Sequence, residues 1–395
     1  MKKIISAILA LTLLSPALFG CEKNTEPAPW QTAEFESFNY NNVENAWYTN
    51  IEYAEENTVF FWDTPSAAIF PLFFFGRGYV TSLNVFDGDK KHIFLRDNSR
   101  AKESLVGDFA IVDSVAYYTA NQTLDDGIED GTYLERINFY SYDRFEKKSE
   151  KIYSVDTYCV NSWMVCDDKL AYTTFEETPY IEDEDYTYEL YVRDLTKEKT
   201  IDICDKAKSY SFVDGELRYI TYEEKTFYLW KYDFDAKKSV QIGTFDGAMG
   251  LDDHLYEEEL SYNFTQDKII ITGESRDYTR FYIYDIETGA LTDHNLPEEV
   301  DSLVAGEAYA YAVCVNLDDM YGDYTDSPDN GIYKIDLTDG TYEKISYEAD
   351  GGTCIYVSSD DEVYIEQYKD AGLSAAKTIY RYDAKNDKSV KLFAK

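Results

Sequence analysis

Histidine is nearly absent from this 395-residue chain, and the common catalytic signatures are missing altogether. Its three histidines, His92, His254 and His294, stand in polar turns or at strand edges, where we expect surface residues rather than catalytic bases. No GxSxG, HExxH or GxxxxGK motif occurs, so nucleophile-elbow hydrolases, zincins and phosphate-loop enzymes have no support. Glycoside cleavage by a pair of carboxylates stays open as an alternative. It depends on the distance between two carboxyl groups in the folded protein, which the sequence does not give. We therefore assign no catalytic residue and expect a protein that is not an enzyme.

Basic residues are also scarce, with 37 lysines and arginines against 76 acidic residues. Without Lys2 and Lys3, which belong to a predicted signal peptide, 35 basic residues remain and the formal charge is −41. Such a chain repels nucleic acids and anionic lipid surfaces. The 38 tyrosines and 22 phenylalanines still predict a large core. The acidic residues are therefore expected on turns and loops.

Cysteine is rare and irregularly spaced. Beyond Cys21 the chain has five cysteines, an odd number, with no CxxC spacing and no histidine nearby. This excludes complete internal pairing and gives no support for a zinc site or a redox pair. We expect buried structural thiols at the following positions: Cys159, Cys166, Cys204, Cys314 and Cys354.

The first twenty residues have the pattern of an export signal. Lys2 and Lys3 precede the largely apolar run from Ile4 to Leu14, which is too short for a membrane span. The sequence Leu-Phe-Gly-Cys that ends at Cys21 resembles the cleavage site of bacterial lipoproteins. That resemblance implies a signal peptide at residues 1–20, a lipidated Cys21 carrying fatty acids such as palmitate, a tether to residue 44, and a location in the cell envelope. An ordinary secretory signal followed by a chance cysteine is the alternative.

A short phrase recurs seven times in the remaining chain. Each copy ends in an aspartate, and successive copies are 39 to 56 residues apart, the period of architectures with one sheet per repeat. The aspartates are Asp87, Asp143, Asp194, Asp233, Asp285, Asp336 and Asp383. Four positions before them the residue is always apolar: Leu83, Phe139, Leu190, Leu229, Phe281, Ile332 and Ile379. The next position is aromatic in six copies: Tyr140, Tyr191, Trp230, Tyr282, Tyr333 and Tyr380, with Asn84 in the first.

The phrase predicts strands that are covered on both faces. Adjacent residues of a strand point to opposite faces, so bulky residues at two successive positions require a cover on each side. Blades stacked in a ring meet this requirement. The sequence therefore predicts an all-β, seven-bladed β-propeller of four-stranded antiparallel blades over residues 45–395. Six or eight blades stay open, because the first unit is irregular and residues 34–40 could add a strand that closes the circle.

The phrases at 282–289 and 380–383 resemble the repeats of bacterial TolB-like and quinoprotein-like propellers. The resemblance involves six to eight residues per unit and implies the fold. The recurring tryptophan of quinoprotein repeats is missing, so no quinone cofactor is expected. A GH…WD signature and a SxDxGxTW box are missing too, which leaves WD40 proteins and sialidases without support.

Three long connections between the second and third strands are rich in carboxylates and predict an anionic rim. The candidate ligand residues are Asp125, Asp126, Glu129, Asp130, Glu182, Asp183, Asp185, Asp318, Asp319, Tyr321, Asp323 and Asp326. Calcium suits such oxygen-rich loops, but none fits the twelve-residue pattern with a closing glutamate, so we expect no dedicated cofactor. The alternative, which we favour for these loops, is solubility, because carboxylate clusters are expected in the loops of so acidic a chain.

The first unit carries the most apolar stretch after the signal, Ala67 to Arg77. It contains the candidate contact residues Phe70, Phe73, Phe74 and Phe75, which either bind a partner or pack under the ring. Our leading hypothesis is a monomeric, lipid-anchored binding or scaffolding module for a protein, peptide or glycan at the cell surface. A carbohydrate-active enzyme and an envelope assembly factor are the alternatives.

Overall fold

The chain divides into two units, Met1–Glu34 and Phe35–Lys395, and everything described below lies in the second. The computed structural model describes residues 51–55, 58–63, 79–84, 90–95, 104–112, 115–124, 134–143, 148–158, 160–174, 188–246, 260–273, 279–318, 323–325, 327–345, 353–357, 362–370, 375–383 and 387–394. The predicted signal peptide, Cys21 and the tether lie outside these ranges. No helix within them is long and apolar enough to cross a membrane.

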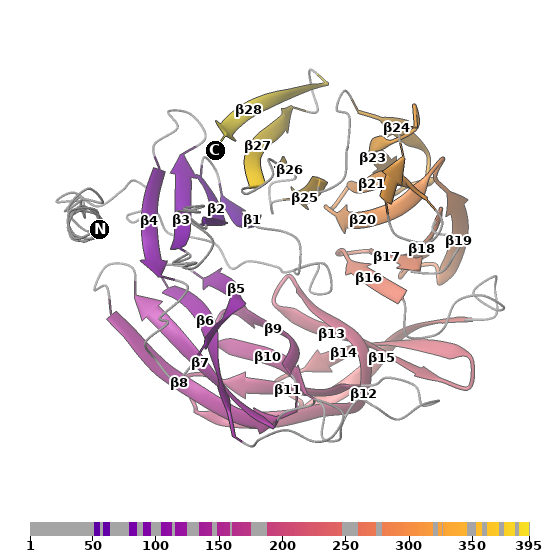
Figure 1. Ribbon diagram of the computed structural model, residues 1–395. Helices are drawn as coiled ribbons and strands as arrows, with labels where there is room; N and C mark the ends of the chain where they lie inside the picture. Colours follow the sequence, from indigo (N-terminus) through magenta and orange to yellow (C-terminus); the bar gives the residue numbers. More distant parts are fainter. Residues whose placement is uncertain are drawn as a thin grey trace, which may run out of the picture. The chain divides into compact units, whose positions relative to one another are not determined.

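Twenty-eight strands form six sheets in the described part of the chain, and every pairing is antiparallel (Figure 1). The first sheet contains β1 (Ile51–Glu55), β2 (Thr58–Asp63), β3 (Tyr79–Asn84) and β4 (Lys90–Leu95). The second contains β5 (Ser104–Val112), β6 (Val115–Thr123), β7 (Glu135–Asp143) and β8 (Lys148–Thr157). The third contains β9 (Val160–Cys166), β10 (Lys169–Thr174), β11 (Tyr188–Asp194), β12 (Lys199–Val213), β13 (Glu216–Glu223), β14 (Thr226–Asp233) and β15 (Lys238–Asp246).

Three further sheets follow. The fourth contains β16 (Leu260–Phe264), β17 (Lys268–Gly273), β18 (Arg280–Asp285) and β19 (Ala290–Asn295). The fifth contains β20 (Glu299–Ala305), β21 (Tyr309–Asp318), β22 (Asp323–Thr325), β23 (Gly331–Asp336) and β24 (Tyr342–Lys344). The last contains β25 (Thr353–Val357), β26 (Val363–Asp370), β27 (Ala375–Asp383) and β28 (Lys388–Ala394).

The seven predicted blades occupy six sheets because two blades share one strand. The first part of β12 pairs with β11 as the outer strand of blade 3, and from Ala207 onward β12 pairs with β13 as the innermost strand of blade 4. Blades 1 and 2 are the first two sheets, and blades 5, 6 and 7 are the last three. Blade 6 has a fifth strand, β22, which extends β21 as a hairpin.

The innermost strands of the blades lie side by side in a ring. Strand β5 contacts β1 and β9, β16 contacts β12 and β20, and β25 contacts β20 and β1. Strands β9 and β12 are joined by a hydrogen bond from Ser162 Oγ to the Tyr210 hydroxyl (3.1 Å). The first and last blades are each built from one continuous stretch of chain, so in the described residues no strand is exchanged across the closure. The predicted closing strand at residues 34–40 lies outside the described ranges.

Both faces of the repeated strand are covered, as predicted. Phe281 is fully buried in the core between blades 5 and 6, whereas its neighbour Tyr282 is buried in the core between blades 4 and 5. Leu229 and Trp230 divide in the same way between the two neighbours of blade 4. Blades 3 to 6 therefore each bury their two faces against different partners, and the core is distributed between the sheets.

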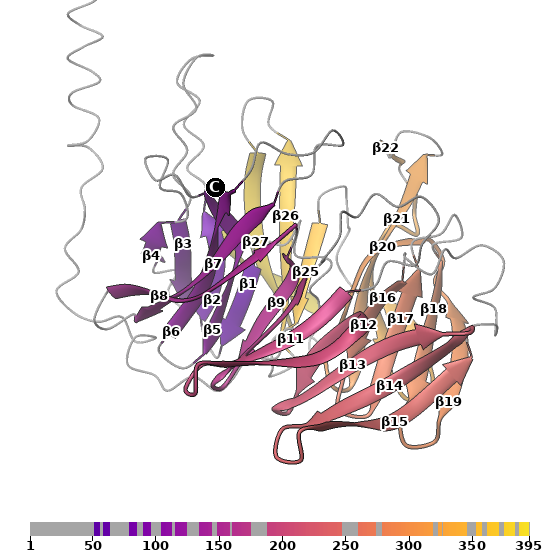
Figure 2. The same ribbon diagram turned by 90° about the horizontal axis from the view of Figure 1, so that it is seen from below.

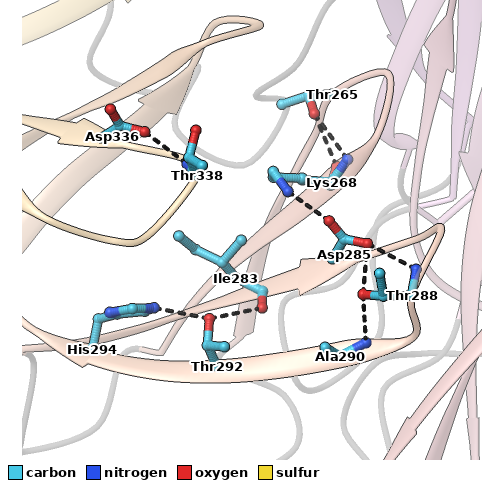
Figure 3. A network of polar contacts seen from close by, with 10 residues as sticks. All are labelled: Thr265, Lys268, Ile283, Asp285, Thr288, Ala290, Thr292, His294, Asp336 and Thr338. Carbon is cyan, nitrogen blue, oxygen red and sulfur yellow. Dashed lines mark hydrogen bonds and ion pairs between the residues drawn. The ribbon is translucent and has the colours of Figure 1, made fainter.

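The repeated aspartates stabilise the turns that follow the third strands. Asp285 accepts hydrogen bonds from the Thr288 backbone N–H (2.8 Å) and hydroxyl (2.7 Å), and pairs with Lys268 Nζ at 2.7 Å (Figure 3). Asp194 binds the backbone and side chain of Lys197 in the same manner. These partners hold the pKa of both carboxyl groups well below the ordinary range. In blade 1 the strand ends at Asn84, so Asp87 lies outside the described residues.

Replacing Asp285 tests this role of the repeat. Asp285→Ala removes the acceptor of two turn hydrogen bonds and the partner of Lys268, so we expect the free energy of unfolding to fall by about 1–3 kcal/mol. Asp285→Asn keeps a side-chain oxygen and is expected to cost less. Urea unfolding provides the measurement. Asp235→Ala, at an exposed turn position of blade 4, serves as the control and should change stability by no more than about 0.5 kcal/mol; an equal loss in both variants would contradict the turn role.

Candidate ligand-binding face

Bulges interrupt the pairing of five innermost strands with their neighbours. One extra residue is inserted in β1, β9, β12 and β20, and two in β5. Strands β16 and β25 pair without interruption. The inserted positions, which we call the bulge collar, are Glu52, 106–108, 161–162, Lys208 and Asp301. Bulges redirect side chains and are frequent beside functional sites, so the collar is a candidate site.

The collar lies at the end of the ring that carries the long loops. Each bulge precedes the turn to the second strand, so antiparallel pairing places it near the end of the second strand and the start of the third. We call this the loop end. The connections there are long in blades 1, 2, 3 and 6, at residues 64–78, 124–134, 175–187 and 319–330. All four of these blades have a bulge. Blades 5 and 7 have short connections and no bulge, whereas blade 4 has a bulge and a short turn.

Most of the predicted rim residues lie outside the described part of the chain. This applies to the candidates in blades 2 and 3, to Asp319, Tyr321 and Asp326 in blade 6, and to the four phenylalanines of blade 1. Asp318 and Asp323 are described by their backbone and stand opposite each other in the hairpin of β21 and β22 (Figure 2). Among the described residues, no group of three or more His, Cys, Asp or Glu side chains is placed to hold a metal ion.

The base of the blade 6 hairpin is fixed by Glu298, which the sequence patterns did not indicate. One carboxylate oxygen of Glu298 accepts a hydrogen bond from Asn316 Nδ2 (3.0 Å), and the other accepts one from Ser327 Oγ (2.5 Å). The Asn316 backbone N–H donates to Asn330 Oδ1 at 2.7 Å. These bonds join the residue before β20 to both sides of the loop, so the hairpin rises from an ordered base.

Three collar side chains are described. Ser162 is buried, and its hydroxyl forms hydrogen bonds with Thr173 Oγ1 (2.9 Å) and the Tyr210 hydroxyl (3.1 Å). Lys208 is buried, with 6% of its surface exposed. Asp301 is exposed at its surface. The surrounding protein nevertheless partly desolvates its carboxyl group, and this desolvation raises the pKa of that group. The other described acidic side chains with shifted pKa values, such as Asp156, Asp168 and Asp285, are shifted downwards because they accept hydrogen bonds from arginine, lysine or threonine. Asp301 therefore differs in kind from the turn aspartates.

His294 has a packing role and is half-buried, whereas the sequence predicted a surface residue. It lies on the outer strand β19, where its ring stacks on Phe281 with 5.1 Å between centroids and its Nε2 contacts Thr292 Oγ1 at 2.8 Å. A Cβ on Gly340, in the turn of blade 6, would overlap the imidazole. Burial lowers the pKa of His294, although Asp293 and Asp339 oppose the shift. The other two histidines are not described at side-chain level.

The cysteines whose burial is described agree with the prediction of structural thiols. Cys166 and Cys314 are buried and unoxidised, and Cys204 is half-buried. Burial raises the pKa of the Cys314 thiol, so it is poorly suited to act as a nucleophile at neutral pH.

Comparisons with known proteins identify the fold. No family model and no curated protein matches the chain. Among solved structures, the β-propeller domain of the Trilobed protease from Pyrococcus furiosus, described as an open velcro topology, matches with a TM-score of 0.52 and 10% identity over 92% of this chain and 97% of that one. A prolyl endopeptidase matches with a TM-score of 0.55 and 10% identity, over 93% of this chain and 51% of that one.

A post-proline cleaving enzyme from Rickettsia typhi is similar at the same level. It matches with a TM-score of 0.52 and 9% identity, over 89% of this chain and 53% of that one. The chain thus spans about half the length of these two peptidases. Identities this low show a shared β-propeller fold alone, and the predicted fold class is confirmed.

The packing of His294 predicts a specific pH dependence. Because the folded state favours neutral imidazole, its contribution to stability is fully present above the ordinary pKa of about 6.5 and is lost as pH falls below it. The free energy of unfolding of the wild type should therefore decline between pH 7.5 and 5.5 more steeply than that of His294→Phe, which keeps an aromatic ring and cannot titrate. Carboxylate titrations are largely common to the two variants, so they cancel when the two slopes are compared. Parallel slopes would contradict the assignment.

Proposed function

We propose that this chain is a lipid-anchored binding module that holds a protein or peptide ligand at the loop end of its propeller. The observation that carries the proposal is the coincidence of bulges and long loops: all four blades with long connections also have a bulged innermost strand. Loops vary without cost to the core, but bulges interrupt the pairing of the strands that form the ring. Their clustering at one end supports a role at that end.

The charge of the chain favours a partner with basic groups. A formal net charge of −39 repels nucleic acids and anionic membranes, and it accelerates association with cationic surfaces. Among the acidic candidates, Asp318 lies at the end of the second strand of blade 6 and so at the loop end. In the sequence, Asp125 and Glu182 follow the second strands of blades 2 and 3. A peptide or protein segment that spans several blades would contact loops and collar together.

Lipid attachment through Cys21 would keep the module at the membrane surface of the cell envelope. The signal pattern at residues 1–21 supports this part of the proposal. In this arrangement the propeller itself needs no membrane contact, and a monomer suffices for binding.

Site-specific photocrosslinking tests the binding face. Peptides that bind the full chain are first selected from a displayed random library. A benzophenone amino acid is then placed at Leu124, 37% exposed, whose backbone N–H bonds Leu134 O at 2.9 Å across the base of the blade 2 loop. We expect the selected peptides to crosslink there. The same amino acid at Val240, an exposed outer-strand position near the opposite end, should give no product. Crosslinking at Val240 alone, or the absence of any enriched peptide, would reject the proposal.

The lipid anchor is tested separately by metabolic labelling. Cells that express the wild type should incorporate labelled palmitate into the protein, and the product should partition into the detergent phase of Triton X-114. Cys21→Ser should lose both properties. Cys204→Ser, which changes a half-buried thiol inside the propeller, should retain them. Label that persists in Cys21→Ser would show that another residue is modified.

A further inference from the structure

Asp301 is set apart by its place in the ring. Its neighbours Val300 and Leu303 both pack into the core between blades 5 and 6. Ser302 stands opposite Val313, which belongs to the core between blades 6 and 7. The extra residue of the bulge enters neither core and is exposed. Because β20 is an innermost strand, the direction left for this side chain is the middle of the ring.

The Asp301 carboxylate is open to a ligand. Among the described residues, no hydrogen bond or ion pair reaches it, whereas the nearby Glu298 has both of its oxygens engaged by Asn316 and Ser327. Desolvation is the cause of the raised pKa of Asp301, and no described cation offsets it. Burial is the main cause of the raised pKa of the Cys314 thiol, and the negative charges of Glu298 and Asp301 add to it.

A partly desolvated carboxylate without a partner gains most from a cationic donor. When ionised it can only accept hydrogen bonds, and charge-assisted bonds to ammonium or guanidinium groups are roughly twice as strong as neutral ones. The surrounding protein weakens screening, so the attraction is larger than on an open surface. A neutral hydroxyl or amide would leave the charge uncompensated.

We propose that Asp301 forms the recognition site for a lysine or arginine side chain of the bound peptide or protein. This inference rests on the proposed function and deepens it, because it names the chemistry that the loop end selects. The bulge in β20 supplies the geometry by turning one side chain out of both flanking cores. The charge of the chain supplies the long-range attraction that brings a basic segment to it.

The test uses fluorescein-labelled hexalysine and hexa-arginine, with hexaglutamine as the uncharged probe. Fluorescence anisotropy with the full chain at about 150 mM salt, where long-range attraction is screened beyond about 8 Å, gives the dissociation constants. We expect Asp301→Asn to weaken binding of at least one basic peptide by about tenfold. Asp235→Asn removes the same charge at an exposed turn near the opposite end of the ring and should change affinity by less than about twofold. Circular dichroism and thermal unfolding of the two variants establish that both are folded.

Equal weakening of binding by the two variants would show a general effect of charge and overturn the site. Binding of hexaglutamine as tight as that of the basic peptides, or no binding of either basic peptide, would also overturn it. These outcomes are separable from failure of the proposed function. Library peptides that crosslink at Leu124 but bind Asp301→Asn as tightly as the wild type would leave the binding face standing and reject Asp301. Basic peptides that depend on Asp301, with no crosslink at Leu124, would leave the carboxylate site standing without the loops.

Discussion

Burial of both sheet faces, seen in blades 3 to 6, is the constraint on which this structure depends. A blade places its apolar phrase residue against one neighbour and its aromatic residue against the other, as Phe281 and Tyr282 do, so no blade can complete its core alone. Each blade therefore needs a neighbour on both sides, and the contact between β1 and β25 closes the ring so that the first and last blades also have one. Substitutions within the faces disturb two blades at once. Variation is therefore tolerated mainly at the loops and at the inner edge of the ring.

The same constraint explains how so acidic a chain folds. Most of the described carboxylates lie outside the cores, with Glu366 of β26 as a buried exception. The turns between third and fourth strands offer backbone N–H groups and lysines that stabilise carboxylates, as at Asp194 and Asp285. Ionised side chains in these turns contribute to stability at neutral pH, because their pKa values lie below those of the unfolded chain. Part of the acidity is thus structural. An acidic group outside such a turn, without described donors, needs another explanation.

The sequence predicted those features that depend on local chemistry. The repeated phrase marked the third strands of blades 2 to 7, each of which ends at the phrase aspartate, and the apolar phrase residues proved to be core in each copy whose burial is described. The sequence did not predict features that depend on the pairing of two strands. Asp318 and Asp323 were predicted to lie in a loop, but they belong to β21 and β22, because these two strands pair as a hairpin. β12 belongs to two blades. The short spacing of 39 residues between Asp194 and Asp233 is consistent with this shared strand, but the spacing alone did not predict it.

The bulges could not be predicted from the sequence for the same reason. Nothing in Val300-Asp301-Ser302 marks the middle residue as extra, since a bulge is a mismatch between two strands and not a property of either. Sequence reasoning therefore placed the candidate site in the loops, where acidic residues are conspicuous, and missed the collar beneath them. An innermost strand is bounded by neighbouring blades on two sides and by its partner strand on a third. For Asp301, which leaves this pairing, the centre of the ring is the remaining direction. The one-residue insertion can therefore expose a carboxylate that the surrounding protein partly desolvates, and neither core is disturbed.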